Sequence, residues 1–209
     1  AKRGEPVAGA AGTTTSGADT SGEDALHSAA AVMAAGLQPS LLEFLDGTTA
    51  RAIQDYRDMG LPPDVGGLLM AQSDRGPRAP QDVAAMAELC REHGAVEVAV
   101  ASDAAEADLL LEARRLVHYG LEQLGDTLID DVAVPLSRLP DLLAGIERIS
   151  GEHDVLVACP GHVGDGNMHP TVVYRAGDPE QTARALDAFG AIMELGLSLG
   201  GTITGEHGV

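Results

Sequence analysis

The side chains best suited to chemistry lie in an eight-residue stretch, His-Val-Gly-Asp-Gly-Asn-Met-His, which begins at His162 and ends at His169. Its centre, Asp165-Gly166, is typical of a two-residue type I′ turn, because both central positions of that turn need a positive φ. Counting outward from such a turn, His162 faces His169 directly across a hairpin. Directly opposed Cβ atoms are roughly 4.5–5.5 Å apart, so the stretch predicts two imidazoles that can turn toward one metal ion.

A second chemically active pair stands at the end of the chain, where Glu206 and His207 lie between glycines. Two imidazoles and one carboxylate with open positions suit Zn, Mn or non-haem Fe. We therefore expect His162, His169 and Glu206 to bind a divalent metal. In an extended segment His207 points away from Glu206, and a neutral imidazole is suited to abstract a proton. The alternative is a cross-strand polar pair with Glu206 and His207 on the surface.

Helices and strands that could position these residues alternate along most of the chain. Taken alone, this alternation favours a parallel α/β sheet, whereas the Asp-Gly turn requires at least one antiparallel pair. Hydrophobic periodicity, caps and glycine stops predict helices at 25–35, 48–58, 81–93, 103–124, 139–149 and 179–199, and strands at 41–45, 65–71, 96–100, 132–134, 155–159, 172–174 and 202–204.

The composition of the chain limits its partners. Thirteen basic and thirty-two acidic residues give a formal charge of −19, which repels phosphate backbones and anionic lipid surfaces. We therefore expect no nucleic acid partner. No apolar run approaches the roughly 20 residues of a membrane span, and we expect a cytoplasmic protein. Cys90 and Cys159 have no close spacing, and we expect both to be buried and reduced.

The first 22 residues differ in composition from the remainder. Residues 1–22 are rich in Gly, Ala, Thr and Ser and contain one Val as their largest aliphatic residue. Such a segment buries too little surface to offset its ordering entropy, so we expect a flexible lead-in, followed by one domain at 23–209. The chain begins at Ala1 and stops just after the Glu-His pair, which favours a fragment truncated at its C-terminus.

Two linked motifs carry a family resemblance. The segment Gly161–Pro170, followed after one helix by Gly200–Val209, is similar to the C-terminal domain of FAD-linked oxidases and dehydrogenases. That family contains the glycolate oxidase flavoprotein subunit, D-lactate dehydrogenases and D-2-hydroxyglutarate dehydrogenase. The resemblance extends from about Ser28 to Val209. It implies an α+β cap domain with a largely antiparallel sheet and covering helices, as a fragment of a larger flavoprotein whose N-terminal FAD-binding domain is absent here.

The resemblance also implies roles for individual residues. It places the divalent metal at the two histidines and Glu206, and it makes His207 the base that takes the hydroxyl proton of a 2-hydroxy acid while the α-hydride passes to the flavin. Arg114 corresponds to an arginine that grips the substrate carboxylate with a bidentate fork, although Leu111 stands where the family usually has tryptophan. Gly205 and Gly208 would allow the backbone to approach the flavin ring.

Two further observations concern the substrate. His118 lies one turn beyond Arg114 on the same helical face, so it could line the same pocket. Ile129 and Thr171 stand where the hydroxyglutarate-specific members place a lysine and an asparagine that contact substrate. Their presence points to a smaller monocarboxylic acid such as lactate or glycolate.

These observations together favour an FAD-dependent oxidation of a small D-2-hydroxy acid to the 2-oxo acid, assisted by a metal and a histidine base. A homo-oligomer and accessory subunits both stay open. A metal-dependent hydrolase could use the same residues to activate water, with His207 as proton shuttle. A non-catalytic cap or accessory module is the third interpretation.

Overall fold

The computed structural model describes residues 13–19, 21–62 and 64–205. Its helices and strands follow one another along the chain in a mixed order. They are β1 (Thr13–Asp19), α1 (Gly22–Ala34), β2 (Leu41–Asp46), α2 (Gly47–Tyr56), β3 (Gly67–Ser73), α3 (Ala79–Glu92), β4 (Glu97–Val100), α4 (Ala104–Leu110), α5 (Glu112–Glu122), β5 (Asp126–Ile129), β6 (Val132–Ala133), α6 (Leu139–His153), β7 (Leu156–Ala158), β8 (Gly161–His162), β9 (Asn167–Met168), β10 (Thr171–Tyr174) and α7 (Pro179–Ser198), with short 3-10 turns at Gly76–Arg78 and Leu136–Arg138.

The strands form two antiparallel sheets. Within the described residues the larger sheet has seven strands in the order β4-β1-β3-β2-β8-β9-β6, and the smaller has the order β5-β10-β7. Each of the strand pairs in both sheets is antiparallel. The α+β fold with a largely antiparallel sheet is therefore confirmed, and the parallel sheet that simple alternation favours does not form.

The predicted flexible lead-in is wrong for residues 13–19. These residues form β1, which lies between β3 and β4 in the larger sheet. Its three consecutive threonines favour extended backbone because they are β-branched. Gly17 is buried, and a Cβ there would stand 3.4 Å from Ala95 and 3.5 Å from Cys90. Counting large aliphatic residues missed this strand, because backbone pairing on both sides and the close approach of Gly17 to Ala95 and Cys90 stabilise it.

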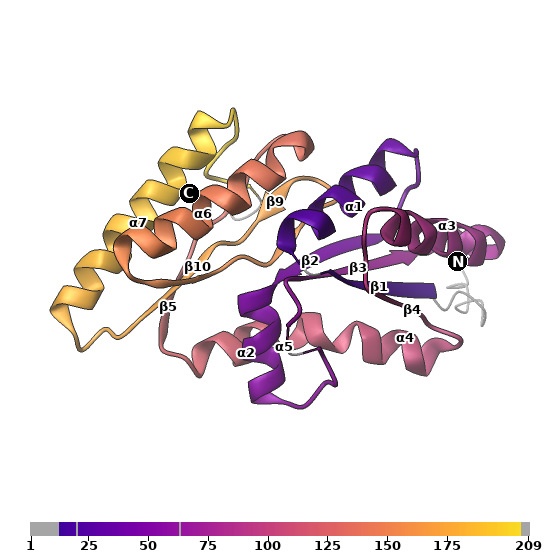
Figure 1. Ribbon diagram of the computed structural model, residues 1–209, viewed down its shortest axis with the longest axis horizontal. Helices are drawn as coiled ribbons and strands as arrows, with labels where there is room; N and C mark the ends of the chain where they lie inside the picture. Colours follow the sequence, from indigo (N-terminus) through magenta and orange to yellow (C-terminus); the bar gives the residue numbers. More distant parts are fainter. Residues whose placement is uncertain (1–12, 20, 63, 206–209) are drawn as a thin grey trace, which may run out of the picture.

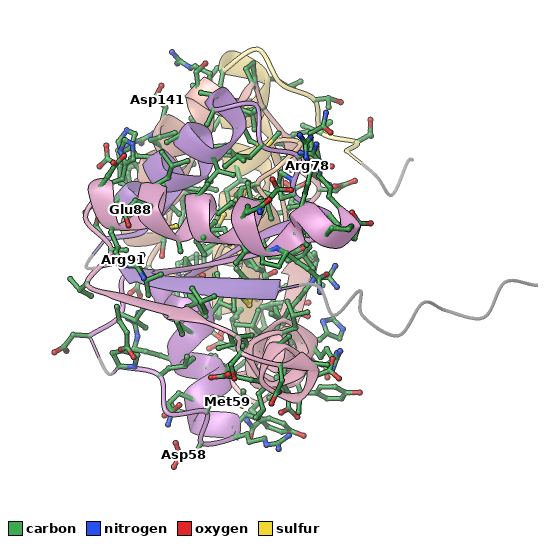
Figure 2. The ribbon with its side chains drawn as sticks, turned by 90° about the vertical axis from the view of Figure 1, so that its right-hand side faces the viewer. Asp58, Met59, Arg78, Glu88, Arg91 and Asp141 are labelled. Carbon is green, nitrogen blue, oxygen red and sulfur yellow. The ribbon has the colours of Figure 1, made fainter. Side chains whose placement is uncertain are left out.

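Helices cover both faces of the larger sheet, and two further helices pack against the smaller sheet. In Figure 1, α1 and α3 lie above the larger sheet, α2, α4 and α5 lie below it, and α6 and α7 lie against the smaller sheet. Figure 2 views the larger sheet nearly edge-on, with Glu88 and Arg91 of α3 on one side and Asp58 and Met59, just after α2, on the other. One face of β2 thus looks toward α5, which carries Arg114.

One continuous hydrophobic core joins the two sheets. It includes fully buried side chains from α1 (Leu26), β2 (Phe44), α6 (Leu142 and Ile146) and β9 (Met168). Because α6 packs on both α1 and α7, the core extends from the larger sheet to the smaller one. The hairpin β8–β9 is therefore anchored in the core.

The predicted long helix at 103–124 is two helices. Asp103 caps α4 by accepting from the backbone N–H groups of the next turn, and the chain turns at Leu111 before α5 begins. The break lets α4 pack on β1 while α5 packs on α2. At that second contact Gly120 lies against the backbone of Ala52. Two packing partners in different directions explain a break that helical periodicity did not predict.

Both cysteines are buried, as predicted. Burial raises the pKa of the Cys159 thiol well above its usual value, and the nearby carboxylate of Asp46 adds to this effect. Cys159 is therefore a poor nucleophile in this fold. Among the described helices, none combines the length and the apolar character that crossing a bilayer requires.

Candidate functional site: two histidines beside an apolar cavity

The histidine segment forms an antiparallel hairpin whose register differs from the prediction. Gly161 pairs with Met168 and His162 pairs with Asn167, so the loop has four residues, 163–166, instead of two. Gly166 has a φ of 85°, but Asp165 has no positive φ, so the predicted type I′ turn does not form. The predicted direct pairing of His162 with His169 is wrong.

Tertiary contacts explain the larger loop. Val163 is completely buried in the core, and the carbonyl of Gly166 accepts a hydrogen bond of 3.0 Å from the Val134 N–H. Within the loop, the Asp165 carboxylate accepts from the Asn167 N–H at 3.2 Å. A two-residue turn would instead place Val163 in the ladder. The burial of Val163 and the contact with Val134 outweigh the local preference of Asp-Gly.

The two imidazoles nevertheless meet. The His169 N–H donates to the Pro160 carbonyl at 2.8 Å, which places His169 two residues beyond the His162–Asn167 pair. Side chains alternate between the faces of a strand, so an offset of two residues keeps both histidines on one face as diagonal neighbours. Their ring centroids are 5.0 Å apart, with an angle of 80° between the ring planes.

Glu43 holds the first histidine from the neighbouring strand. It lies opposite His162 in the β2–β8 register, and its carboxylate oxygens are 2.8 and 2.9 Å from His162 Nδ1. On the other side, Arg114 Nε of α5 is 3.1 Å from Glu43 Oε1. The Glu43 side chain is only 9% exposed, so it is a buried carboxylate between two site residues.

Asp131 stands beside the second histidine. Its Oδ1 lies 3.7 Å from His169 Nδ1, and its backbone N–H donates to the Asp130 carboxylate at 2.9 Å. Burial raises the pKa of the Asp130 carboxyl, and the negative charge of Asp131 adds to that rise. Nδ1 of His162 is thus hydrogen-bonded to a carboxylate, an arrangement in which Nε2 is the nitrogen that binds a metal. The distance of 3.7 Å between His169 Nδ1 and Asp131 is too long for a hydrogen bond.

The histidines line an open, mainly apolar cavity of about 670 Å³. Carboxylates, imidazoles and guanidinium groups contribute to its wall, together with aliphatic and aromatic side chains. The lining includes Glu43, Arg114, His118, Asp130, Asp131, His162 and His169 among the polar residues, and Leu45, Val117, Ile129, Phe189, Met193 and Ile203 among the apolar ones.

The predicted substrate-binding residues both line this cavity. Arg114 reaches it from α5, and its side chain is 44% exposed. His118 is one turn further along, where its Nε2 lies 3.3 Å from Glu122. The neighbouring Arg115 pairs with Asp108 at 3.2 Å, so of the two arginines Arg114 is the one directed to the histidines through Glu43.

The chain passes this site again at Gly205. The Gly205 N–H donates to the Asp131 carbonyl at 3.2 Å. A side chain at Gly205 would collide with the amide oxygen of Asn167 and with the Asp131 carboxylate, so the packing of the protein disfavours any larger residue here. Glu206, His207 and Gly208 lie outside the described residues. Within the described part of the chain, no three His, Cys, Asp or Glu side chains form a group that could hold a metal ion.

Sequence reasoning missed Glu43 and Asp131. The signal for Glu43 was present, because it is a charged residue inside the otherwise apolar run 41–45, and a buried polar residue is more informative than an exposed apolar one. The position of Asp131 depends on the pairing of β6 with β9. No local motif indicates that pairing.

Comparisons with known proteins agree with this fold. The chain matches the family model described as FAD linked oxidases, C-terminal domain, over residues 17–209. It is 37% identical over 181 residues to the glycolate oxidase subunit GlcD of Bacillus subtilis, covering 85% of this chain and 38% of the relative. It is 26% identical over 191 residues to the probable mitochondrial D-lactate dehydrogenase of Danio rerio, covering 90% of this chain and 38% of the relative.

A solved structure shares the fold at low identity. The structure of p-cresol methylhydroxylase with substrate bound superposes with a TM-score of 0.69 and 14% identity, covering 91% of this chain and 44% of that chain. The chain thus spans about two fifths of the length of the relatives it matches. Because the family model extends over nearly all of the chain, this protein belongs to the FAD-linked oxidases, of which it contains the C-terminal domain.

Proposed function

We propose that this chain is the substrate-binding domain of an FAD-dependent enzyme that oxidises a small D-2-hydroxy acid to the 2-oxo acid. The observation that carries the proposal is the placement of two imidazoles, 5.0 Å apart, beside Arg114 in one apolar cavity. The FAD-linked family and the names of its glycolate oxidase and D-lactate dehydrogenase members support the choice of reaction.

The donor set fits a divalent metal. Nδ1 of His162 is hydrogen-bonded to the Glu43 carboxylate, which leaves Nε2 of this histidine for the ion, and the Asp131 carboxylate lies 3.7 Å from Nδ1 of His169. The two ring centroids lie 5.0 Å apart, so His162 and His169 are close enough that both would hold one ion. We propose Glu206 as the third ligand, because it follows directly after Gly205 and supplies a carboxylate.

We assign substrate binding and proton transfer to separate residues of this chain. Arg114 binds the substrate carboxylate and thereby directs the 2-hydroxyl group toward the histidines. When bound, the metal would lower the pKa of that hydroxyl, and FAD would accept the α-hydride. His207 accepts the hydroxyl proton as general base. The substrate loses one proton and one hydride, so the product is the 2-oxo acid.

The cavity wall favours a substrate with one carboxylate. Both arginines line the cavity, but Arg114 pairs with Glu43 through Nε, whereas Arg115 pairs with Asp108 through a terminal nitrogen. We therefore propose Arg114 as the arginine that binds a substrate carboxylate with its terminal nitrogens. Ile129 and Thr171, where hydroxyglutarate-specific members place lysine and asparagine, both lie in the lining. We therefore propose a monocarboxylic acid with a short or apolar side chain, such as glycolate or lactate.

The test is anaerobic reduction of the flavin in the full-length protein. We expect D-lactate or glycolate to bleach the flavin absorbance, and D-2-hydroxyglutarate to do so much more slowly. Arg114→Met should raise KM for the hydroxy acid about 10- to 100-fold, because it removes hydrogen bonds to a charged group. Removing the metal with a chelator should abolish reduction, and added Zn²⁺ or Mn²⁺ should restore it.

Arg115→Met is the matched control, because it removes a guanidinium one position away that is bound to Asp108. We expect it to leave KM nearly unchanged. A full-length protein that contains no flavin, or full activity after complete metal removal, would contradict the proposal. A flavin-free protein that cleaves esters or amides would instead support the metal-dependent hydrolase.

A further inference from the structure

Glu43 occupies an unusual position for a charged side chain. It lies in β2 between apolar residues, its side chain is 9% exposed, and the large sheet continues on both sides of its strand. A buried carboxylate is unfavourable unless donors compensate for its lost hydration. Among the described residues, the partners recorded for this carboxylate are the His162 imidazole, through hydrogen bonds, and the Arg114 guanidinium, through an ion pair.

We propose that Glu43 is a positioning residue that fixes the tautomer of His162 and the orientation of Arg114 at the same time. The inference rests on the proposed function, in which His162 binds a metal and Arg114 binds the substrate carboxylate. One buried carboxylate would then join the metal site to the substrate-binding site. Glu43 itself contacts neither group.

The Glu43 carboxylate determines which nitrogen of His162 carries the hydrogen. An ionised carboxylate can only accept hydrogen bonds, and both Glu43 oxygens lie within 2.9 Å of His162 Nδ1. Nδ1 must therefore carry the hydrogen. The neutral imidazole has one N–H and one lone pair, so the lone pair is placed on Nε2. That is the nitrogen and the protonation state that metal binding requires.

The contact with Glu43 also orients the guanidinium of Arg114. Glu43 contacts Arg114 through Nε, at 3.1 Å, so the two terminal nitrogens are not needed to hold the side chain. Those terminal nitrogens form the end of the fork that can bind a second carboxylate bidentately. The Arg114 side chain is 44% exposed and lies on the cavity wall, so a ligand in the cavity can reach it.

The partners of Glu43 distinguish a positioning role from a purely structural one. A structural carboxylate would bind backbone groups or a helix end, as Asp46 does when it accepts from Thr49 and Cys159. The recorded partners of Glu43 are two cavity-lining side chains from different elements, β8 and α5. Loss of Glu43 is therefore expected to disturb the site more than the fold.

The experiment uses Glu43→Gln, which keeps the size of the side chain. The glutamine amide can accept from Nδ1–H or donate to a bare Nδ1, so the tautomer is no longer fixed. In ¹⁵N spectra of the histidine rings, we expect the neutral His162 to be the Nδ1–H tautomer in the parent protein and a mixture in the variant. Titration of the metal-free protein with Zn²⁺ should show affinity reduced about 10- to 100-fold. KM for D-lactate should rise as Arg114 loses its support.

Glu112→Gln is the control, because Glu112 lies on the same helix as Arg114 but pairs with Arg57. It should change neither the tautomer nor the Zn²⁺ affinity. A parent protein with Nε2–H at His162 would overturn the inference even if the variant cannot be purified. Unchanged tautomer and unchanged Zn²⁺ affinity in Glu43→Gln would also overturn it. A parent protein that has the Nδ1–H tautomer and binds Zn²⁺, yet oxidises no hydroxy acid, would refute the proposed function and leave the role of Glu43 intact.

Discussion

Asp46 is the residue whose removal gives the clearest prediction. It ends β2 and caps α2, where Oδ1 accepts from the Thr49 N–H at 3.1 Å and from the Thr49 hydroxyl. The same oxygen accepts from the Cys159 N–H at 3.0 Å. Asp46 is buried. One carboxylate oxygen thus fastens the start of a helix to the segment that leads into the histidine hairpin.

The magnitude for Asp46→Ala follows from these contacts. Loss of an N-cap costs about 0.5–2 kcal/mol, and a buried donor left without its acceptor costs about 1–3 kcal/mol. Allowing for overlap, we expect the free energy of unfolding to fall by about 2–4 kcal/mol. For a domain of this size, such a loss lowers Tm by roughly 4–16 °C. Asp46→Asn keeps an acceptor oxygen, so we expect its free energy of unfolding to fall by only about 1 kcal/mol.

Denaturant unfolding followed by far-UV circular dichroism measures this difference. Asp178→Ala is the matched control, because Asp178 caps α7 through the Glu180 and Gln181 N–H groups but lies exposed at the surface. We expect that variant to lose only the cap contribution of about 1 kcal/mol. Equal losses for Asp46→Ala and Asp178→Ala would refute the importance of the Cys159 contact.

Three further variants test packing and burial, each by its unfolding free energy. Gly120→Ala should destabilise by about 1–3 kcal/mol, because the new methyl group would meet the Ala52 backbone at 2.9 Å. Gly190→Ala should stabilise by up to about 1 kcal/mol, because a Cβ there meets no described atom within 4 Å. Asp130→Asn should stabilise the protein at neutral pH. Burial raises the Asp130 pKa, so the parent protein loses stability as the pH rises from the ordinary carboxyl pKa through the raised one, and the variant should lack this loss. Destabilisation by Gly190→Ala, or unchanged stability in Gly120→Ala, would contradict the packing argument for that residue. If Asp130→Asn kept the pH dependence of stability of the parent protein, the argument from the Asp130 pKa would be wrong.

The sequence alone predicted most elements and the meeting of the histidines, but it predicted that meeting from the wrong register. The face of the sheet on which a side chain lies depends only on whether its spacing along the strand is even or odd. An error of two residues in the register therefore left His162 and His169 on the same face. The loop length depended on Val163, which is buried by residues distant in the sequence. Local turn preference contains no information on that burial.

Long-range pairing also explains why the two carboxylates beside the histidines went unpredicted. Glu43 reaches His162 through the β2–β8 register, a pairing between residues more than one hundred positions apart. Asp131 reaches His169 through the pairing of β6 with β9. β1 was missed for the same reason, since its position depends on β3 and β4. Periodicity identifies elements, whereas these contacts depend on which elements become neighbours.

The two buried acids of β2 explain how the hairpin is held. Glu43 and Asp46 are three positions apart, so they face opposite sides of the sheet. Asp46 binds the Cys159 N–H and Glu43 binds the His162 imidazole, on either side of Pro160 and Gly161. A segment fastened at both ends, from both faces of one strand, cannot rotate His162 without breaking a charged hydrogen bond. The orientation of that imidazole is therefore determined by β2 in the core of the domain.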